Sequence, residues 1–152
     1  MLTENKPGVL ARIAGVLSAR GFNIDGLTLA QTEDPNRTRI TLVVEGPEKL
    51  GAQLIKKLNN IISVEEAHDF SETVVVRLEA ALVKVRTELV KVPALLKEAF
   101  VFDARVVDSS HAVFTFELTG EPSEVDAFIK AVHHYGEIEV ARSGMILMPK
   151  ET

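Results

Sequence analysis

The segment of the chain best suited to binding chemistry is Asn5-Lys6-Pro7-Gly8, which directly precedes a run of apolar residues at helical spacing. The first turn of a helix has unpaired N–H groups and a partial positive charge, so a carboxylate fits there readily. Gly8 has no side chain to keep a ligand from the backbone. Asn5 offers the donor and the acceptors that suit the carboxylate and ammonium groups of an amino acid. The alternative is that Asn5 only caps the helix, and these residues by themselves leave both interpretations open.

No other group of side chains forms a convincing catalytic or metal-binding constellation. The chain contains no cysteine, no nucleophile elbow of the G-x-S-x-G type and no phosphate-binding P-loop. None of the four histidines has the spacing of a zinc site; they are His68, His111, His133 and His134. We therefore expect no catalytic residue and no metal ligand. A metal-responsive module that uses these histidines is the alternative.

The composition narrows the classes of function. Hydrophobic residues make up 46% and charged residues 26% of the 152 residues, which suits one ordinary domain or two small ones. No apolar run approaches the roughly 18 residues of a membrane span, and no secretory signal opens the chain. The net charge of −5 and the aromatic content of 5% argue against a general nucleic-acid binder. We expect a cytoplasmic protein, or an organellar one if a transit peptide has been removed, that binds neither nucleic acid nor membrane.

A repeated pattern divides the chain into two similar halves. A strand, Gly46, Pro47 and a helix in the first half match a strand, Gly120, Pro122 and a helix in the second. Periodicity in the first half predicts helix, strand, strand, helix and strand at residues 8–19, 22–30, 39–45, 50–58 and 61–65. In the second half it predicts strand, helix, two strands, helix and strand at residues 80–86, 93–101, 104–108, 111–119, 122–133 and 138–141. With one strand before Gly8, each half is a ferredoxin-like βαββαβ unit, and the fold class is α+β.

The same patterns predict where the halves meet and which side chains face inward. Residues 1–70 and 80–152 are expected to form the two domains, and residues 71–79 either link them or are partly helical. Phe22, Ile24, Leu27 and Leu29 are expected to turn inward. A turn at Ser109-Ser110 joins two strands of the second half.

The strand before Gly8 is unusually short, because Met1 to Glu4 falls below the usual length of about five or six residues. In a ferredoxin-like sheet this strand lies in the interior, and a missing part would leave ladder groups of its neighbour unpaired. Either the strand is stunted or the chain starts inside the natural one. We expect a first domain that is weakened or is completed by a partner.

Three motifs carry a resemblance to a known family. Residues 2–28 include R-G-F-N-I-x-x-L-T from Arg20 to Thr28, T-R-I-T-L follows at residues 38–42, and V-A-R-S-G follows at residues 140–144. With these segments in this order over nearly the whole chain, the sequence closely resembles the regulatory, or small, subunit of acetohydroxyacid synthase, also called acetolactate synthase. It departs from the family in its short first strand, in Gly26 where serine is common, and in Thr38 where serine is usual.

The resemblance implies an N-terminal ACT domain, a ferredoxin-like amino-acid sensor, followed by a second ferredoxin-like domain. It implies no catalysis and no cofactor on this chain. The family's small subunit binds a catalytic subunit that carries thiamine diphosphate, Mg²⁺ and FAD, raises its activity, and confers feedback inhibition by valine or a related branched-chain amino acid. The effector site lies between ACT domains of two subunits, so the resemblance implies a homodimer with Asn5, Gly8 and Asn23 as effector contacts. Asn23 depends on the resemblance alone. An ACT-type sensor that serves a different enzyme or a transcriptional system is the alternative.

Overall fold

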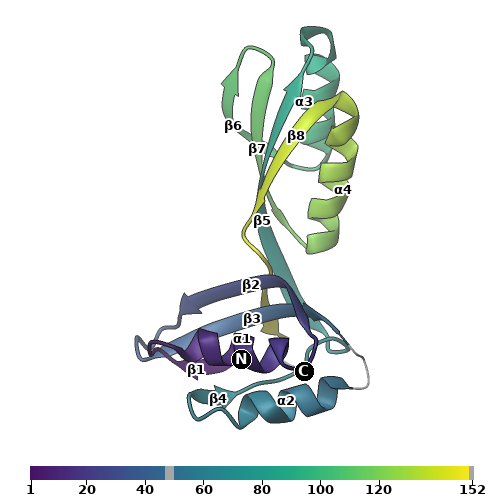
Figure 1. Cartoon of the computed structure of the whole chain (residues 1–152). Helices are drawn as coiled ribbons and strands as arrows, with labels where there is room; N and C mark the ends of the chain where they lie inside the picture. The colour runs from purple at the N-terminus through teal and green to yellow at the C-terminus, as the bar shows by residue number, and fades with distance from the viewer. Residues whose placement is uncertain (47–49, 151–152) are drawn as a thin grey trace. The chain divides into compact units, whose positions relative to one another are not determined.

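The computed structural model describes residues 1–46 and 50–150 (Figure 1). Its contacts divide the chain into a first unit of Met1–Val76 with Leu147–Thr152 and a second unit of Arg77–Ile146. No helix in the described part of the chain is both long enough and apolar enough to cross a membrane.

The first unit is an antiparallel sheet in the order β2-β3-β1-β4 with two helices packed on it (Figure 1). Its elements are β1 (Leu2–Glu4), α1 (Val9–Ser18), β2 (Asn23–Gln31), β3 (Arg37–Glu45), α2 (Gly51–Asn59) and β4 (Val64–Glu66). The spacing of Val9, Ile13 and Leu17 places them on one face of α1, and this face is buried. The two helices and the sheet share one core, which also contains Ile40, Leu54, Leu58, Val64 and Ala67.

The strand β1 is short and lies in the interior of this sheet, between β3 and β4. Thr3 opposes Thr38 on β3 and Val64 on β4. The ladder extends to Met1, since the nitrogen of Met1 donates to the oxygen of Ile40 at 2.8 Å and the nitrogen of Ile40 donates to the oxygen of Met1 at 2.9 Å. The expected α+β fold of two ferredoxin-like units with a short first strand is confirmed. The expected weakness of the first domain, or its completion by a partner, stays a prediction.

The prediction that four apolar residues between Phe22 and Leu29 turn inward is confirmed for Phe22, which packs against the core, but is wrong for the other three, which are exposed. Ile24, Leu27 and Leu29 are 37%, 36% and 48% exposed. Leu27 opposes Leu42 and Leu29 opposes Ile40, so they face the same side of the sheet as the core residues of β3. They remain uncovered because β2 is an edge strand and the core of the first unit does not extend over these residues.

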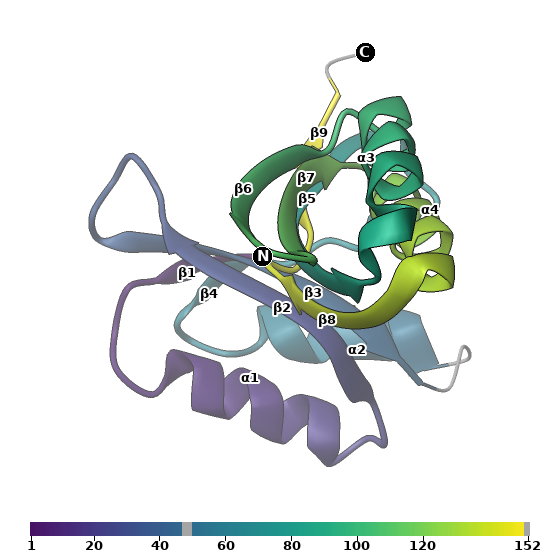
Figure 2. The same cartoon turned by 90° about the horizontal axis from the view of Figure 1, so that it is seen from above.

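The second unit repeats the arrangement, with a sheet in the order β6-β7-β5-β8 and β9 paired to β5. Figure 2 shows α3 and α4 together beside its strands. Its core contains residues of two strands, β5 and β7, and of both helices, with Phe116 and Phe128 at 0% exposure. The elements are β5 (Val75–Thr87), η2 (Leu89–Lys91), α3 (Val92–Val101), β6 (Arg105–Ser110), β7 (Val113–Gly120), α4 (Pro122–Val132), η3 (His133–Tyr135) and β8 (Gly136–Arg142). The strand β9 (Ile146–Pro149) belongs to the first unit from Leu147 onward.

Three details of this half differ from the sequence-based expectation. The strand β5 begins at Val75, so the end of the segment at 71–79 is extended rather than helical, as its run of valines favours. The turn between β6 and β7 lies at His111 and Ala112 instead of Ser109-Ser110, because Ser110 already opposes Val113. His111 has φ 53°, the left-handed conformation that tight hairpin turns use. The short strand β9 was not expected.

Candidate effector site

The loop before α1 ends at Gly8, where the backbone adopts a conformation that favours glycine. Gly8 is the N-cap residue of α1 with φ 83° and ψ −6°, in the left-handed region that glycine adopts at little cost. A Cβ atom at this position would meet nothing within 4 Å, so space is not the constraint. No side chain caps α1, and its first turn contains no acidic residue. The N-terminus of α1 therefore presents N–H groups without a side-chain acceptor, and the interpretation of Asn5 as the cap is wrong.

Asn5 instead is held by the loop between β2 and β3. Its backbone nitrogen donates to the oxygen of Asn36 at 2.7 Å, and its Nδ2 donates to the oxygen of Pro35 at 3.0 Å. The oxygen of Pro35 also accepts a hydrogen bond from Nε2 of Gln31 at 2.8 Å. Within residues 1–46 and 50–150, Oδ1 of Asn5 has no hydrogen bond. This oxygen can therefore accept a hydrogen bond from an ammonium group beside the start of α1.

The loop at residues 32–36 is itself well ordered by hydrogen bonds. Oδ1 of Asp34 accepts from the backbone nitrogen of Asn36 at 2.9 Å, which makes an Asx turn. Arg37, the first residue of β3, pairs with Glu65 at 3.2 Å and with Asp34 at 3.6 Å. The sequence indicated the Asp-Pro turn but not its proximity to Asn5. That proximity depends on the pairing of β1 with β3, which local patterns do not encode.

Asn23 lies at the other end of β2 from these groups. It opposes Glu45, whereas Gln31, which shares the Pro35 oxygen with Asn5, opposes Thr38. Eight residues separate the two ends of the strand, which at about 3.4 Å per residue corresponds to roughly 27 Å. Its Nδ2 donates to Oδ1 of Asp25 at 2.5 Å. A single chain therefore brings Asn5 and Gly8 together but places Asn23 far from both.

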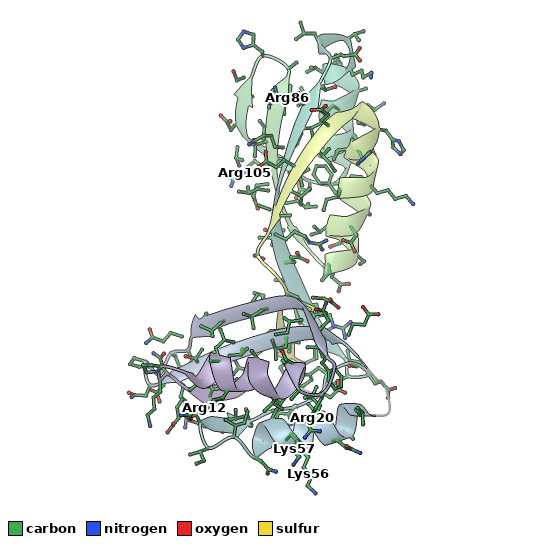
Figure 3. All side chains as sticks on the ribbon, viewed as in Figure 1. Arg12, Arg20, Lys56, Lys57, Arg86 and Arg105 are labelled. Atoms are coloured by element: carbon green, nitrogen blue, oxygen red, sulfur yellow. The ribbon has the colours of Figure 1, made fainter. Side chains whose placement is uncertain are left out.

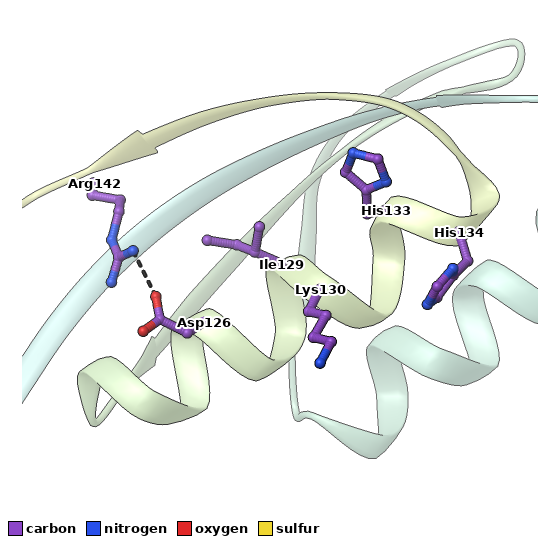
Figure 4. Close-up of a pocket in the computed structure, with 6 residues that line it drawn as sticks. All are labelled: Asp126, Ile129, Lys130, His133, His134 and Arg142. Atoms are coloured by element: carbon purple, nitrogen blue, oxygen red, sulfur yellow. Dashed lines mark hydrogen bonds and ion pairs between the residues drawn. The ribbon is translucent and has the colours of Figure 1, made fainter.

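The histidines do not form a metal centre in the residues that the structure describes. No group of three or more His, Cys, Asp or Glu side chains there is arranged to hold a metal ion. A pocket of about 300 Å³ in the second unit is lined by Asp126, Ile129, Lys130, His133, His134 and Arg142 (Figure 4). Its carboxylate is already engaged, since Nη1 of Arg142 donates to Oδ1 of Asp126 at 2.7 Å. The two cationic side chains of this pocket would also repel a metal ion, so the pocket gives the metal-responsive alternative no support.

The late motif V-A-R-S-G has a structural explanation in the same unit. Arg142 donates to both carboxylate oxygens of Glu79, with Nη2–Oε2 at 2.8 Å, and Glu79 is only 5% exposed. These hydrogen bonds raise the pKa of Arg142 above its already high value, so its guanidinium group stays charged. Ser143 adds two bonds to Ala80, from nitrogen to oxygen at 2.9 Å and from the Ala80 nitrogen to Oγ at 3.0 Å. The hydrogen bonds of this motif therefore connect the end of β8 to β5.

Comparison with known proteins agrees with this fold and with these motifs. Residues 1–66 match the family model described as the AHAS small subunit-like ACT domain, and residues 78–151 match that described as the small subunit of acetolactate synthase. A protein of Archaeoglobus fulgidus named "Probable acetolactate synthase small subunit" is 42% identical over 148 residues, which cover 97% of this chain and 92% of that protein. The chain belongs to the acetolactate synthase small-subunit family.

Further relatives extend the match across distant organisms. The acetolactate synthase isozyme 3 small subunit of Escherichia coli is 32% identical, with 96% of this chain and 90% of that protein covered. The crystal structure of the acetolactate synthase small subunit of Thermotoga maritima has a TM-score of 0.86 at 32% identity, over 100% of this chain and 95% of that one. As a member of this family, the small subunit is a regulatory ACT-domain protein, and catalysis belongs to the separate large subunit.

Proposed function

We propose that this small subunit activates the large subunit of acetolactate synthase and confers feedback inhibition by valine, bound at the N-terminus of α1. The observation that carries this proposal is the uncapped start of α1 at Gly8, with the carboxamide of Asn5 held beside it by the oxygen of Pro35. A carboxylate would accept hydrogen bonds from the first-turn N–H groups, where the helix dipole favours negative charge. The ammonium group would donate to Oδ1 of Asn5. We place the sensing domain at residues 1–70 and the second domain at residues 80–152, and a cytoplasmic setting stays a prediction.

A homodimer would complete the site. One of the two edge strands of the first sheet is β2, which has the exposed side chains of Leu27 and Leu29 and one carboxylate, that of Asp25. If β2 of two copies pairs antiparallel about a two-fold axis near Leu27, Asn23 of one copy lies opposite Gln31 of the other. Because Gln31 and Asn5 bond to the same carbonyl oxygen, this arrangement would bring Asn23 to the effector loop, Asn5 to Gly8, of the second copy. The distance that separates these groups within one chain supports a site shared by two chains.

Inhibition would follow from a shift between two arrangements of this dimer. Valine can shift the equilibrium only by its difference in affinity for the two arrangements. Because the coupling is reciprocal, binding of the large subunit should change the affinity for valine by the same factor by which valine changes the affinity for the large subunit. The chemistry of the reaction, with thiamine diphosphate, Mg²⁺ and FAD, stays on the large subunit in this proposal.

The test is the activity of the reconstituted large subunit, with and without this chain, across a valine titration. We expect activation without valine, inhibition with it, and a clear loss of inhibition for Asn5→Ala with activation largely kept. Asn60→Ala, a change of the same type at an exposed position at the end of α2, should be inhibited normally. Normal inhibition of Asn5→Ala would show that the site is misplaced, and an absence of activation by the unchanged chain would contradict the function itself.

A further inference from the structure

The helical layer of the first unit has a surface with charge of one sign. Arg12 lies on α1, Arg20 follows this helix, and Lys56 and Lys57 lie in the last turn of α2 (Figure 3). Neither helix contains an Asp or Glu residue, although the whole chain has a net charge of −5. The two helices pack against each other, so these charges belong to one layer. We call the four cations, together with Ile62, the basic helical surface.

The cations of this surface are free of partners inside the chain. Across residues 1–46 and 50–150, none of the four side chains makes an ion pair or a hydrogen bond. Two other cations of the same unit are paired, Lys6 with Glu4 at 3.1 Å and Arg37 with Glu65 at 3.2 Å. Like charges in one layer repel, so folding of the first unit alone does not account for the segregation.

Helix electrostatics accounts for only part of this arrangement. Lys56 and Lys57 lie at the C-terminal end of α2, where cations complement the helix dipole. Arg12 is the fourth residue of α1 and lies close to the N-terminal end, where the dipole disfavours a cation. Its charge is therefore better explained by an external acidic partner than by the stability of α1.

An exposed apolar side chain follows Lys56 and Lys57 closely in the sequence. Ile62 is 95% exposed in the bend that follows α2, whereas its neighbour Ile61 packs against the core. A large apolar group within a charged rim is the usual composition of a protein–protein contact, with the apolar group as anchor. The two helices contain no aromatic residue on which a nucleic-acid base could stack.

We propose that the basic helical surface binds a carboxylate-rich surface of the acetolactate synthase large subunit. The inference rests on the proposed function, because that function requires the two subunits to associate. A protein partner is favoured over nucleic acid by the isoleucine anchor, by the lack of aromatic side chains and by the net negative charge of the chain. Charged rims act mainly on the rate of association, so the contact should weaken as salt increases.

The experiment measures the affinity of the large subunit for the full-length chain at low and high salt by surface plasmon resonance. Lys56→Glu/Lys57→Glu should weaken binding by about tenfold or more at low salt and reduce the salt dependence. Lys97→Glu/Lys130→Glu places the same change of charge on α3 and α4 of the second unit and should bind like the unchanged chain. Ile62→Ser, which leaves the charge unaltered, should mainly raise the rate of dissociation.

The outcomes distinguish a failure of this inference from a failure of the proposed function. If the unchanged chain does not bind or activate the large subunit, the proposed function fails. If it binds, and Lys56→Glu/Lys57→Glu binds equally well with the same salt dependence, only the assignment of the surface is overturned. Equal weakening by the control pair would overturn it as well, since net charge alone would then explain the effect. Binding of a short DNA duplex at moderate salt, lost in Lys56→Glu/Lys57→Glu, would replace the protein partner by nucleic acid. Calorimetry should show unchanged valine binding by the Lys56→Glu/Lys57→Glu chain, which confirms that its fold is intact.

Discussion

Replacement of Gly8 by alanine tests the argument that the effector loop depends on backbone conformation. Gly8 has φ 83°, and a Cβ atom would meet nothing within 4 Å, so the substitution adds no steric contact with other residues. The cost is therefore the local one of a non-glycine residue in the left-handed region, about 1–2 kcal/mol. We expect Gly8→Ala to lower the free energy of unfolding by this amount. Urea unfolding followed by circular dichroism measures it.

Gly15 in the same helix is the matched control, and its expected effect has the opposite sign. It is exposed within α1, has no positive φ, and a Cβ atom there also meets nothing within 4 Å. Gly15→Ala should raise the free energy of unfolding by about 0.5–1 kcal/mol through helix propensity. It should also leave valine affinity unchanged, whereas Gly8→Ala should weaken it, because a shifted backbone misdirects the first-turn N–H groups. Equal stability of the two variants would refute the conformational argument.

Three further predictions concern the rest of the chain. Arg142→Ala leaves the buried carboxylate of Glu79 without its bidentate partner and should cost about 2 kcal/mol in urea unfolding, part of which the further change Glu79→Gln should restore. Hydrogen bonds from Ser71 lower the pKa of Asp69, so this pair stabilises the fold above the ordinary pKa of the carboxyl group, and the stabilisation is lost as the pH falls through the lowered pKa. NMR titration should show a higher Asp69 pKa in Ser71→Ala, and an unchanged pKa would contradict the assigned cause. Phe116→Ala removes a side chain of 0% exposure that packs edge-on against the ring of Phe128, with the ring centroids 5.9 Å apart. It should lower the free energy of unfolding by about 3–5 kcal/mol in thermal or urea unfolding, and a loss below about 1 kcal/mol would be inconsistent with a close-packed core.

Much of the fold could be predicted from local pattern, because the periodicity of each element is written in neighbouring residues. The helix over Val9–Ser18 and the strand over Arg37–Glu45 follow directly from the spacing of their apolar side chains. The turn between β6 and β7 could not be located in this way. It depends on the strand register, which places His111 in a left-handed conformation without an Asn-Gly or Asp-Gly signal.

The candidate site, too, could be predicted only in part from the local sequence. The position of Gly8 at the start of a helix could be predicted from the sequence, and its left-handed conformation explains why glycine stands there. Asn5 could be chosen as a donor and acceptor, but its actual partner, the oxygen of Pro35, lies thirty residues away along the chain. The role of Asn23 came only from the resemblance, and within one chain it lies at the other end of β2 from Gln31, which shares the Pro35 oxygen with Asn5.

The order of helices and strands, the duplication of the fold, the family and the choice of Asn5 and Gly8 all follow from the amino-acid sequence. Which side chains of these elements are exposed depends on how the elements pack together. Leu27 and Leu29 have the pattern of core residues, yet β2 lies at the sheet edge and the core does not cover it. Periodicity in the sequence indicates the side of a helix or strand on which a residue lies. What covers that side depends on contacts between residues far apart in the chain, and these are set only when the sheet is assembled.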